Sequence, residues 1–402
     1  MRGLLPFLIV LFAVAFVTKV DFFFYLLYAL SGIYILGRIW ARRSLAAVSL
    51  WRHHDRRVFW NERFQVRIDV HNRSLLPVLW MRIADTVPAE LAVGKSFRQV
   101  ISLSPRERLR LTYTLTGRRR GYYGLGPLVA EGGDLLGSAS YEKRHESDDY
   151  VIVYPKIVAL RDLGFPSQSP FGTLPSRERL FEDPTRIRGV RDYQSGDSLR
   201  RMDWKTSARV GALQVRRFEP AIALETAIFL NLHGGDYGPA ERIVATELGI
   251  VIAASISVHL VEKRQSIGLV TNGQDPLRDP DLGGSPAAVP ALPLRKGREH
   301  LMDVLDLLAR IQVAPEGEAV PFLDLLNRRS MGLPWGSTVV VVTAREVEGL
   351  LHTLLTLRRR GLVVILVTTC IDRDNAQTIR RADQIGIRAL EIRSEQGMDA
   401  WR

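Results

Sequence analysis

The sequence predicts a multidomain protein with an N-terminal transmembrane α-hairpin, an all-β sandwich and a doubly wound α/β domain, in that order. Three observations support this. Two apolar runs stand near the N-terminus, short segments of alternating apolar and polar residues follow, and wholly apolar segments then alternate with helical ones. The length of 402 residues suits two or three domains. We place two transmembrane helices at 1–40, a basic linker at 41–57, the β-sandwich at 58–155, a connection at 156–221 and the α/β domain at 222–402.

The two apolar runs are Leu4–Val17 and Phe22–Leu36, and Lys19 and Asp21 separate them. Each is slightly shorter than the roughly 20 residues that a membrane span prefers. A cleavable signal peptide is the alternative interpretation. The second apolar run and the lack of a small-x-small cleavage site between the runs disfavour it. We therefore expect a transmembrane hairpin.

Basic residues predict the orientation of this hairpin. Arg2 precedes the first helix, and several arginines follow the second. These are Arg38, Arg42, Arg43 and Arg52. The positive-inside rule then places both ends, and the whole body, in the cytoplasm. A single long span with an external body would need the basic stretch 38–57 to cross the membrane. The net charge of +12 also suits a protein that lies against an anionic membrane surface or binds nucleic acid.

A basic amphipathic stretch, Ser44–Arg57, is predicted as the linker. His53 and His54 lie in it without further ligands at suitable spacing, so we expect them to be solvated and not to bind metal.

Residues 58–155 are predicted to be strand-rich. Apolar residues alternate with polar ones over 64–70, which is the period of a half-buried strand. Further strands are expected over 78–83, 97–103 and 109–115, with glycines at the turns. Short strands at this spacing indicate a β-sandwich.

From residue 222 onward, apolar strands alternate with helices. This alternation predicts a parallel, doubly wound sheet. The strands are expected at 226–232, 266–271, 338–342, 363–368 and 389–392. The helices are expected at 240–261, 299–312, 320–329, 346–359 and 376–384, with a loop at 275–293.

The most specific stretch of the chain is Gly189–Glu219. A turn is expected at Tyr193–Gly196, and Asp197 then stands where a helix N-cap belongs. A helix over 198–209 would turn Leu199, Met202 and Trp204 inward and end at Gly211. A strand is expected over 212–218.

The run from Arg191 to Arg209 reads R-x-Y-x-x-G-D-x-x-R-x-x-D-W-x-x-S-A-R, and an R-R-F-E strand follows it. It resembles the signature of the bacterial family called domain of unknown function 58. Arg119–Pro127 resembles the family's second recurring element. Gly133–Gly137 resembles its D-P-F-G turn, with Leu in place of Pro. Arg118–Arg120 could grip a phosphate or form a solvated turn.

The resemblance implies a membrane-anchored protein of the bacterial inner membrane with a von Willebrand factor A-like (Rossmann-like) C-terminal domain. It also implies a MoxR-type AAA+ ATPase as a partner, and no established enzymatic activity. Three interpretations of the signature residues stay open: a structural ion-pair network with Trp204 packed across it, a surface for a partner or ligand, and a catalytic constellation. The residues are Arg191, Tyr193, Gly196, Asp197, Arg200, Asp203, Trp204, Ser207 and Arg209.

The metal site of that fold is degenerate in this sequence. The fold places ligands at the carboxyl ends of its strands, in a D-x-S-x-S motif with a neighbouring Thr and Asp. Here Asn231, His233 and Gly235 replace the motif's Asp and both serines, and Thr343 is followed by Ala and Arg. Because Mg²⁺ needs several hard oxygen ligands, we expect no bound metal and no cofactor.

The sequence contains no P-loop, G-x-S-x-G or H-E-x-x-H motif, and Cys370 lies in an apolar run. We therefore expect a non-enzymatic, membrane-anchored interaction scaffold or adaptor that works in protein assembly or maturation. One alternative is binding of anionic lipid or nucleic acid by basic surfaces that include Arg358–Arg360, without sequence specificity. The other is a hydrolase or transferase that uses the signature.

Overall fold

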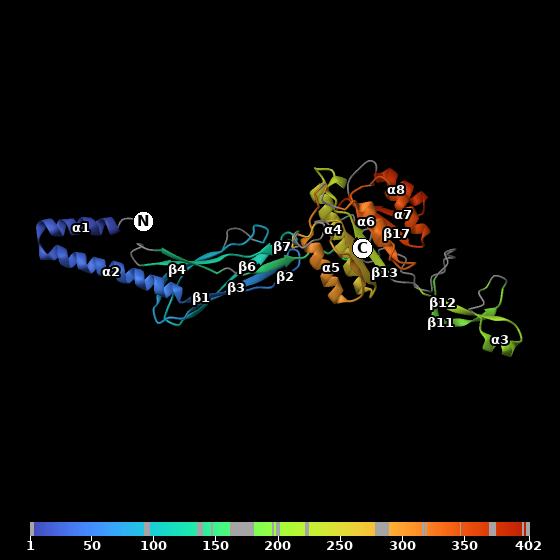
Figure 1. Cartoon of the computed structure of the whole chain (residues 1–402), viewed down its shortest axis with the longest axis horizontal. Helices are drawn as coiled ribbons and strands as arrows, with labels where there is room; N and C mark the ends of the chain where they lie inside the picture. The colour runs from blue at the N-terminus through green and yellow to red at the C-terminus, as the bar shows by residue number, and fades with distance from the viewer. Residues whose placement is uncertain are drawn as a thin grey trace. The chain divides into compact units, whose positions relative to one another are not determined.

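A computed structural model describes residues 4–91, 97–134, 140–145, 148–160, 181–194, 197, 202–221, 225–277, 289–315, 317, 320–345, 347–369, 375–395 and 398 (Figure 1). The chain divides into two units, Met1–Pro155 and Lys156–Arg402. Within the described residues the protein is multidomain, with helices and sheets in the first unit and an α/β sheet in the second.

Two apolar helices open the chain, α1 (Leu4–Thr18) and α2 (Asp21–Ala46), and Figure 1 shows them side by side. Helix α2 is long and apolar enough to cross a membrane, and α1 is apolar and shorter. Many of their large side chains, such as Phe16 and Leu36, are exposed, which suits an apolar environment and not water.

The linker predicted at 41–57 is wrong. Helix α2 continues to Ala46, and the strand β1 (Val48–His53) follows almost at once. The stretch is rich in arginine, but it also has an apolar face, because Leu45 is buried in the core of the β-rich region. Lys143 then fixes the end of α2, since its Nζ donates to the carbonyls of Ala46 and Val48 at 3.0 and 2.6 Å.

After these helices, the described strands of the first unit form three sheets, with strand orders β1-β3-β6, β5-β4-β8-β9 and β2-β10-β7. The four strands predicted here are confirmed as β3, β4, β5 and β6. Apolar side chains of the first two sheets share one buried core, to which Ile68 and Met81 belong. The strands are β2 (Arg57–Val58), β3 (Arg63–Asn72), β4 (Val78–Asp85), β5 (Arg98–Leu103), β6 (Arg108–Thr116), β7 (Gly121–Gly124), β8 (Leu128–Gly133), β9 (Ser140–His145) and β10 (Tyr150–Val153).

A charged cluster lies inside this unit. The guanidinium of Arg52 is fully buried and donates to both carboxylate oxygens of Asp85, at 3.1 and 2.6 Å. It also donates to Asp149 at 3.0 Å, while the Tyr113 hydroxyl donates to Asp85 at 2.6 Å. Burial raises the pKa of Asp85, although Arg52 opposes the shift. Since Arg52 lies in β1 and Asp85 in β4, this buried pair joins strands of the first two sheets.

The second unit is built on a six-stranded sheet with the order β15-β14-β13-β16-β17-β18. Its pairs are parallel except β14 with β15. The predicted parallel strands are confirmed. The edge strand β15 was missed, and it begins in the last two residues of the loop predicted at 275–293. The strands are β13 (Glu225–Leu230), β14 (Ser266–Thr271), β15 (Leu292–Arg295), β16 (Thr338–Thr343), β17 (Val363–Thr368) and β18 (Arg388–Glu391).

The predicted helices of this unit are confirmed with small shifts of their ends. Helix α4 is also apolar enough to cross a membrane, but 78% of that span is buried, so it is a core helix. The helix predicted from 346 starts only after Gly349, whose φ of 85° interrupts helical geometry. The helices are α4 (Arg242–Glu262), α5 (Arg298–Arg310), α6 (Phe322–Ser330), α7 (Leu350–Arg359) and α8 (Asn375–Gln384).

Part of the stretch predicted as a connection forms a hairpin. Strands β11 (Phe181–Asp192) and β12 (Gln214–Ala221) pair antiparallel, and α3 (Trp204–Val210) lies in the chain between them. The strand β11 was therefore missed inside the connection predicted at 156–221. We call β11, α3 and β12 the signature hairpin.

Candidate functional site

The helix of the signature hairpin starts at Asp203, and the prediction that Asp197 is its N-cap is wrong. The Asp203 carboxylate accepts from the backbone N–H of Thr206 at 3.0 Å and from Nε of Arg216 at 3.2 Å. That backbone N–H, with Arg216, holds the pKa of Asp203 below its ordinary value. Gly211 ends the helix in the left-handed region, as predicted.

Asp197 does not cap the helix and accepts a different set of hydrogen bonds. Both of its carboxylate oxygens accept from the Arg191 guanidinium at 2.7 Å, and one also accepts from the backbone N–H of Gln194 at 2.9 Å. It therefore ties the end of β11 to the following turn. The acidic residues of the signature thus belong to two separate pairs, Arg191–Asp197 and Asp203–Arg216. Gly196, Leu199 and Arg200 lie outside the described residues.

Ser207 is buried and completes the joint between α3 and β12. Its hydroxyl donates to the carbonyl of Asp203 at 2.7 Å and accepts from the backbone N–H of Gln214 at 2.8 Å. Met202 is buried as predicted and pairs with Val215. The side chains of the signature thus build local structure.

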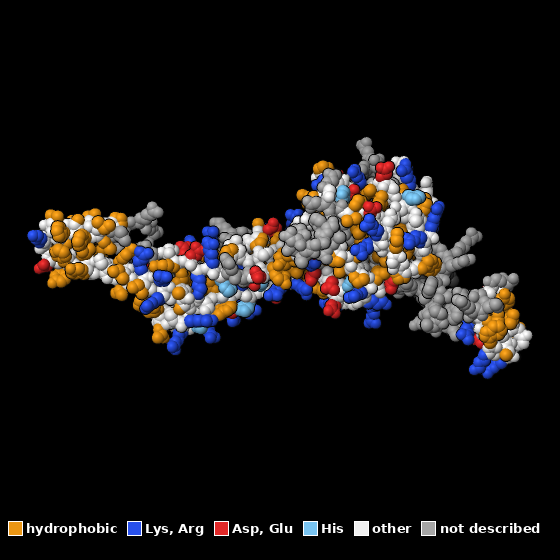
Figure 2. Space-filling view, viewed as in Figure 1, with side chains coloured by type: hydrophobic (Ala, Val, Ile, Leu, Met, Phe, Trp, Pro, Cys, Tyr) orange, Lys and Arg blue, Asp and Glu red, His pale blue; other side chains and the backbone are white. Residues whose placement is uncertain are grey.

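Trp204 does not pack across this network, and that prediction is wrong. Its side chain is 66% exposed, at the first position of α3. Val210 and Leu213 are also exposed, at 61% and 48%. We call these three residues the signature surface. Figure 2 shows hydrophobic side chains gathered on the α3 lobe beside Lys and Arg.

The remaining signature residues lie close by. The backbone N–H of Tyr193 donates to the carbonyl of Leu213 at 2.9 Å, and Arg209 lies in the last turn of α3. Sequence reasoning missed Val210 and Leu213. The sequence placed Leu213 in the strand expected over 212–218 and Val210 between the expected helix and Gly211, so neither was predicted to be exposed.

A second polar cluster lies at the carboxyl ends of the α/β strands. If the six strands are numbered by their order in the chain, they lie in the sheet in the order 3-2-1-4-5-6, so the direction of strand addition reverses between β13 and β16. Doubly wound sheets bind ligands at such a switch point. Asn231 follows β13 there, is fully buried, and donates through Nδ2 to Asp236 at 2.8 Å and to the Thr343 hydroxyl at 3.1 Å. The structure thus brings Asn231 and Thr343 together.

The Asn231 amide nitrogen lies between the Asp236 carboxylate and the Thr343 hydroxyl, where a cation bound by these oxygens would lie. Its Oδ1 accepts from Asn272 at 3.1 Å and from the backbone N–H of His233. His233 Nδ1 lies 3.5 Å from Asp236, and Gly235 sits in a short 3-10 turn with Asp236. Asn272 was missed, although it directly follows an apolar strand as Asn231 does. Within the described part of the chain, no three His, Cys, Asp or Glu side chains are grouped to hold a metal ion.

Comparisons with known proteins identify relatives. A model of the family described as "Protein of unknown function DUF58" matches residues 189–396. The uncharacterized protein YeaD of Bacillus subtilis is 23% identical over 335 residues, 82% of this chain and 78% of that protein. The uncharacterized protein Rv1480 of Mycobacterium tuberculosis is 31% identical over 141 residues, 34% of this chain and 40% of that protein.

Solved structures resemble only part of the chain. Escherichia coli alpha-2-macroglobulin, from domain MG7 to the C-terminus, has 18% identity and a TM-score of 0.24, covering 28% of this chain and 17% of that one. The C-terminal domain of wzt has 11% identity and a TM-score of 0.22, covering 28% and 75%. Scores this low carry no structural argument.

Proposed function

This chain belongs to the family described as "Protein of unknown function DUF58", and from that membership we propose that it is a membrane-anchored, non-enzymatic scaffold or adaptor. It would hold a MoxR-type AAA+ ATPase at the cytoplasmic face of the membrane during assembly or maturation of other proteins. The observation that carries the proposal is the exposure of Trp204, Val210 and Leu213 on the signature hairpin. An exposed Trp on an element that also exposes aliphatic side chains is typical of a binding hot spot.

The finer fold assignment is part of the proposal. The order of the six strands, with one antiparallel edge strand, supports a von Willebrand factor A-like domain. The core shared by the first two sheets of the N-terminal unit supports a β-sandwich. Both folds commonly present loops to partners at one end of a rigid framework.

The contacts inside the signature favour the non-enzymatic interpretation. A nucleophilic serine needs a base that removes its proton. The Ser207 hydroxyl instead donates a hydrogen bond to the carbonyl of Asp203 and accepts one from the backbone N–H of Gln214. Asp197 and Asp203 each accept from an arginine and from a backbone N–H, which suits structural anchoring.

The proposed topology places α1 and α2 in the inner membrane with the body in the cytoplasm. Arg38, Arg42 and Arg43 lie near the end of α2, where the positive-inside rule predicts the cytoplasmic side. Trypsin should cut the body in inverted membrane vesicles and leave it intact in sealed spheroplasts. Cutting in the spheroplasts alone would reverse the topology.

The partner proposal is tested by crosslinking and affinity purification of the full chain from its native membranes. We expect mass spectrometry to recover a MoxR-type ATPase with the wild-type protein. The double variant Trp204→Ser, Val210→Ser should reduce its recovery at least about tenfold, because the apolar anchors of the contact are removed. Val244→Ser is the matched control, since Val244 is 69% exposed on α4 and lies outside the signature surface.

Three results would count against the proposal. Repeated purification that recovers no ATPase and no other protein would remove the scaffold function. If the double variant and Val244→Ser recovered equal amounts of the ATPase, the signature surface would not be the site of contact. Hydrolysis or group transfer by the purified chain that Asp197→Asn abolishes without unfolding it would favour an enzyme instead.

A further inference from the structure

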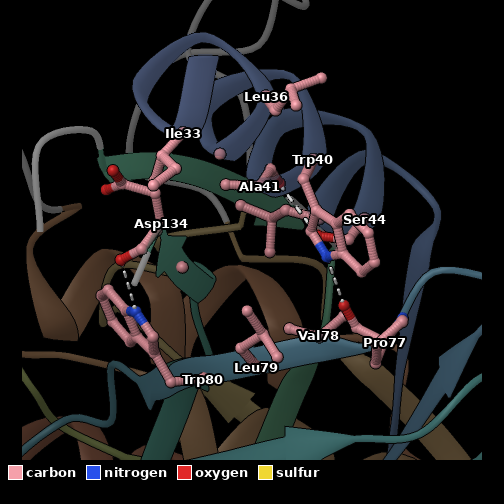
Figure 3. Close-up of a pocket in the computed structure, with 14 residues that line it drawn as sticks. Ile33, Leu36, Trp40, Ala41, Ser44, Pro77, Val78, Leu79, Trp80 and Asp134 are labelled. Carbon is pink, nitrogen blue, oxygen red and sulfur yellow. Dashed lines mark hydrogen bonds between the residues drawn. The ribbon is translucent and has the colours of Figure 1, made fainter. Parts of the chain in front are cut away.

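An apolar groove of about 490 Å³ lies where α2 meets β4 and β8, inside the N-terminal unit (Figure 3). Residues of α2 that recur at helical spacing form one wall, and the start of β4 forms the other. The end of β8 and Asp134 close the groove. The helix contributes Ile33, Leu36, Gly37, Trp40, Ala41 and Ser44, among others. The volume lies within the range of roughly 300–1,000 Å³ for ligand sites.

The Trp and Ser side chains of the walls use their polar groups in hydrogen bonds to backbone carbonyls. Trp40 Nε1 donates to the carbonyl of Pro77 at 3.0 Å, and Trp80 Nε1 donates to the carbonyl of Asp134 at 3.3 Å (Figure 3). The Ser44 hydroxyl donates to a carbonyl of its own helix at 3.2 Å. The groove therefore offers mostly carbon to an occupant.

This chemistry selects the class of ligand. A peptide would bring backbone N–H and C=O groups that need partners, and burying them without partners is costly. A hydrocarbon chain needs none. Leu36 and Ile33 are 67% and 53% exposed, so the same wall continues up α2 as an apolar surface. A groove continuous with a membrane helix is open to the acyl chains of the surrounding lipid.

The charges around the groove favour an anionic lipid. Arg38 and Arg43 lie on α2 at the two flanks of the stripe, and Trp40 is one of the residues that line the groove. Trp is enriched at membrane–water interfaces, and juxtamembrane arginines attract anionic lipid headgroups. Asp134, the one ionisable residue among those that line the groove, disfavours an anionic headgroup inside it.

We propose that this groove binds one acyl chain of an anionic phospholipid, whose headgroup lies outside against the arginines of α2. This inference rests on the proposed membrane anchoring. Bound lipid would fix the angle at which the β-rich body leaves the membrane, because one of its chains would contact both α2 and β4.

The test uses the full chain in phosphatidylglycerol vesicles that carry a photoreactive group on the acyl chain. We expect adducts at Leu79 and Trp80 of β4, which a membrane helix alone would not give. Gly37→Leu fills the groove: an added Cβ would lie 3.6 Å from Cβ of Asp134, an ordinary contact. It should reduce these adducts at least fivefold. Gly32→Leu is the matched control, because it adds the same side chain to the same helix where nothing lies within 4 Å.

Leu79→Gln gives a second test, because it makes the wall polar at a partly exposed position and should also reduce labelling at Trp80. Adducts on α1 and α2 alone, with none on β4, would overturn the groove and leave the anchor standing. A chain that gives no adducts and stays out of the vesicles would overturn the anchor as well. If Gly37→Leu did not reduce the adducts on β4, the groove would not be the binding site. If labelling were equal in phosphatidylcholine vesicles, the site would have no preference for anionic lipid.

Discussion

Asn231→Asp should convert the polar cluster at the strand ends into a cation site. In the wild-type protein the Asn231 amide donates to the Asp236 carboxylate at 2.8 Å and to the Thr343 hydroxyl at 3.1 Å. The substitution removes both donors and places a second carboxylate against the first. The oxygens of the new carboxylate, Asp236 and Thr343 would then be the hard ligands that Mg²⁺ prefers.

The cost without metal follows from these contacts. A hydrogen bond to a charged group contributes about 1.5–3 kcal/mol. Asn231 is fully buried, so the variant also leaves a buried charge without a partner. We therefore expect its free energy of unfolding to fall by about 3–5 kcal/mol in total. If the new site binds Mg²⁺ with a Kd of about 1 mM, then about 10 mM Mg²⁺ restores about 1.4 kcal/mol.

The assay is hydrogen exchange of peptides that cover 225–236 and 338–345, with EDTA and with Mg²⁺. We expect the variant to exchange faster than wild type in EDTA and to regain protection with Mg²⁺, while the wild-type protein does not respond. Asn231→Ala is the control, because it loses the same hydrogen bonds without adding a ligand and should not respond. Protection of the wild-type peptides by Mg²⁺ would refute the reasoning that the amide occupies the place of the cation.

Three further predictions concern stability. Asp85→Ala leaves Arg52 buried without its main partner and should lower the free energy of unfolding of the N-terminal unit by about 3–5 kcal/mol in urea titrations. Burial lowers the pKa of His54 from 6.5, so the folded state favours the neutral ring; stability present above pH 6.5 should fall as the pH drops through the lowered pKa, and His54→Gln should flatten that fall. Ser207→Ala leaves the backbone N–H of Gln214 unsatisfied, which should cost about 1–3 kcal/mol and speed proteolysis of the signature hairpin.

Sequence patterns identified most of the α/β sheet, because a run such as Val339–Val342 has no polar face that another structure could use. They failed where burial depends on distant residues. Strand β15 is short and half-exposed, so its pattern resembles a loop. The stretch 41–57 looked solvated because it is rich in arginine. Its Arg52 is nevertheless buried, because Asp85 and Asp149 approach it from far along the chain.

The signature shows a similar limit. Asp197 and Asp203 are both suitable N-caps by residue type, and only the fold decides between them. Arg191 takes Asp197, while Thr206 stands at the right distance from Asp203. The pairing of charged residues within the motif was expected, but its division into two pairs and the exposure of Trp204 depend on the direction in which α3 leaves the turn.

The contacts at the two candidate sites support the proposed binding role. At the strand ends, an amide nitrogen satisfies the oxygens that would bind a cation. In the signature hairpin, the hydroxyl and carboxylates that could do chemistry are tied to backbone and arginine groups, while Trp204 faces solvent. Acid–base or nucleophilic catalysis needs polar groups that can exchange protons or bonds with a substrate. Binding of a protein partner needs exposed apolar groups that the partner can bury. In the residues that the structure describes at these two sites, the arrangement favours binding.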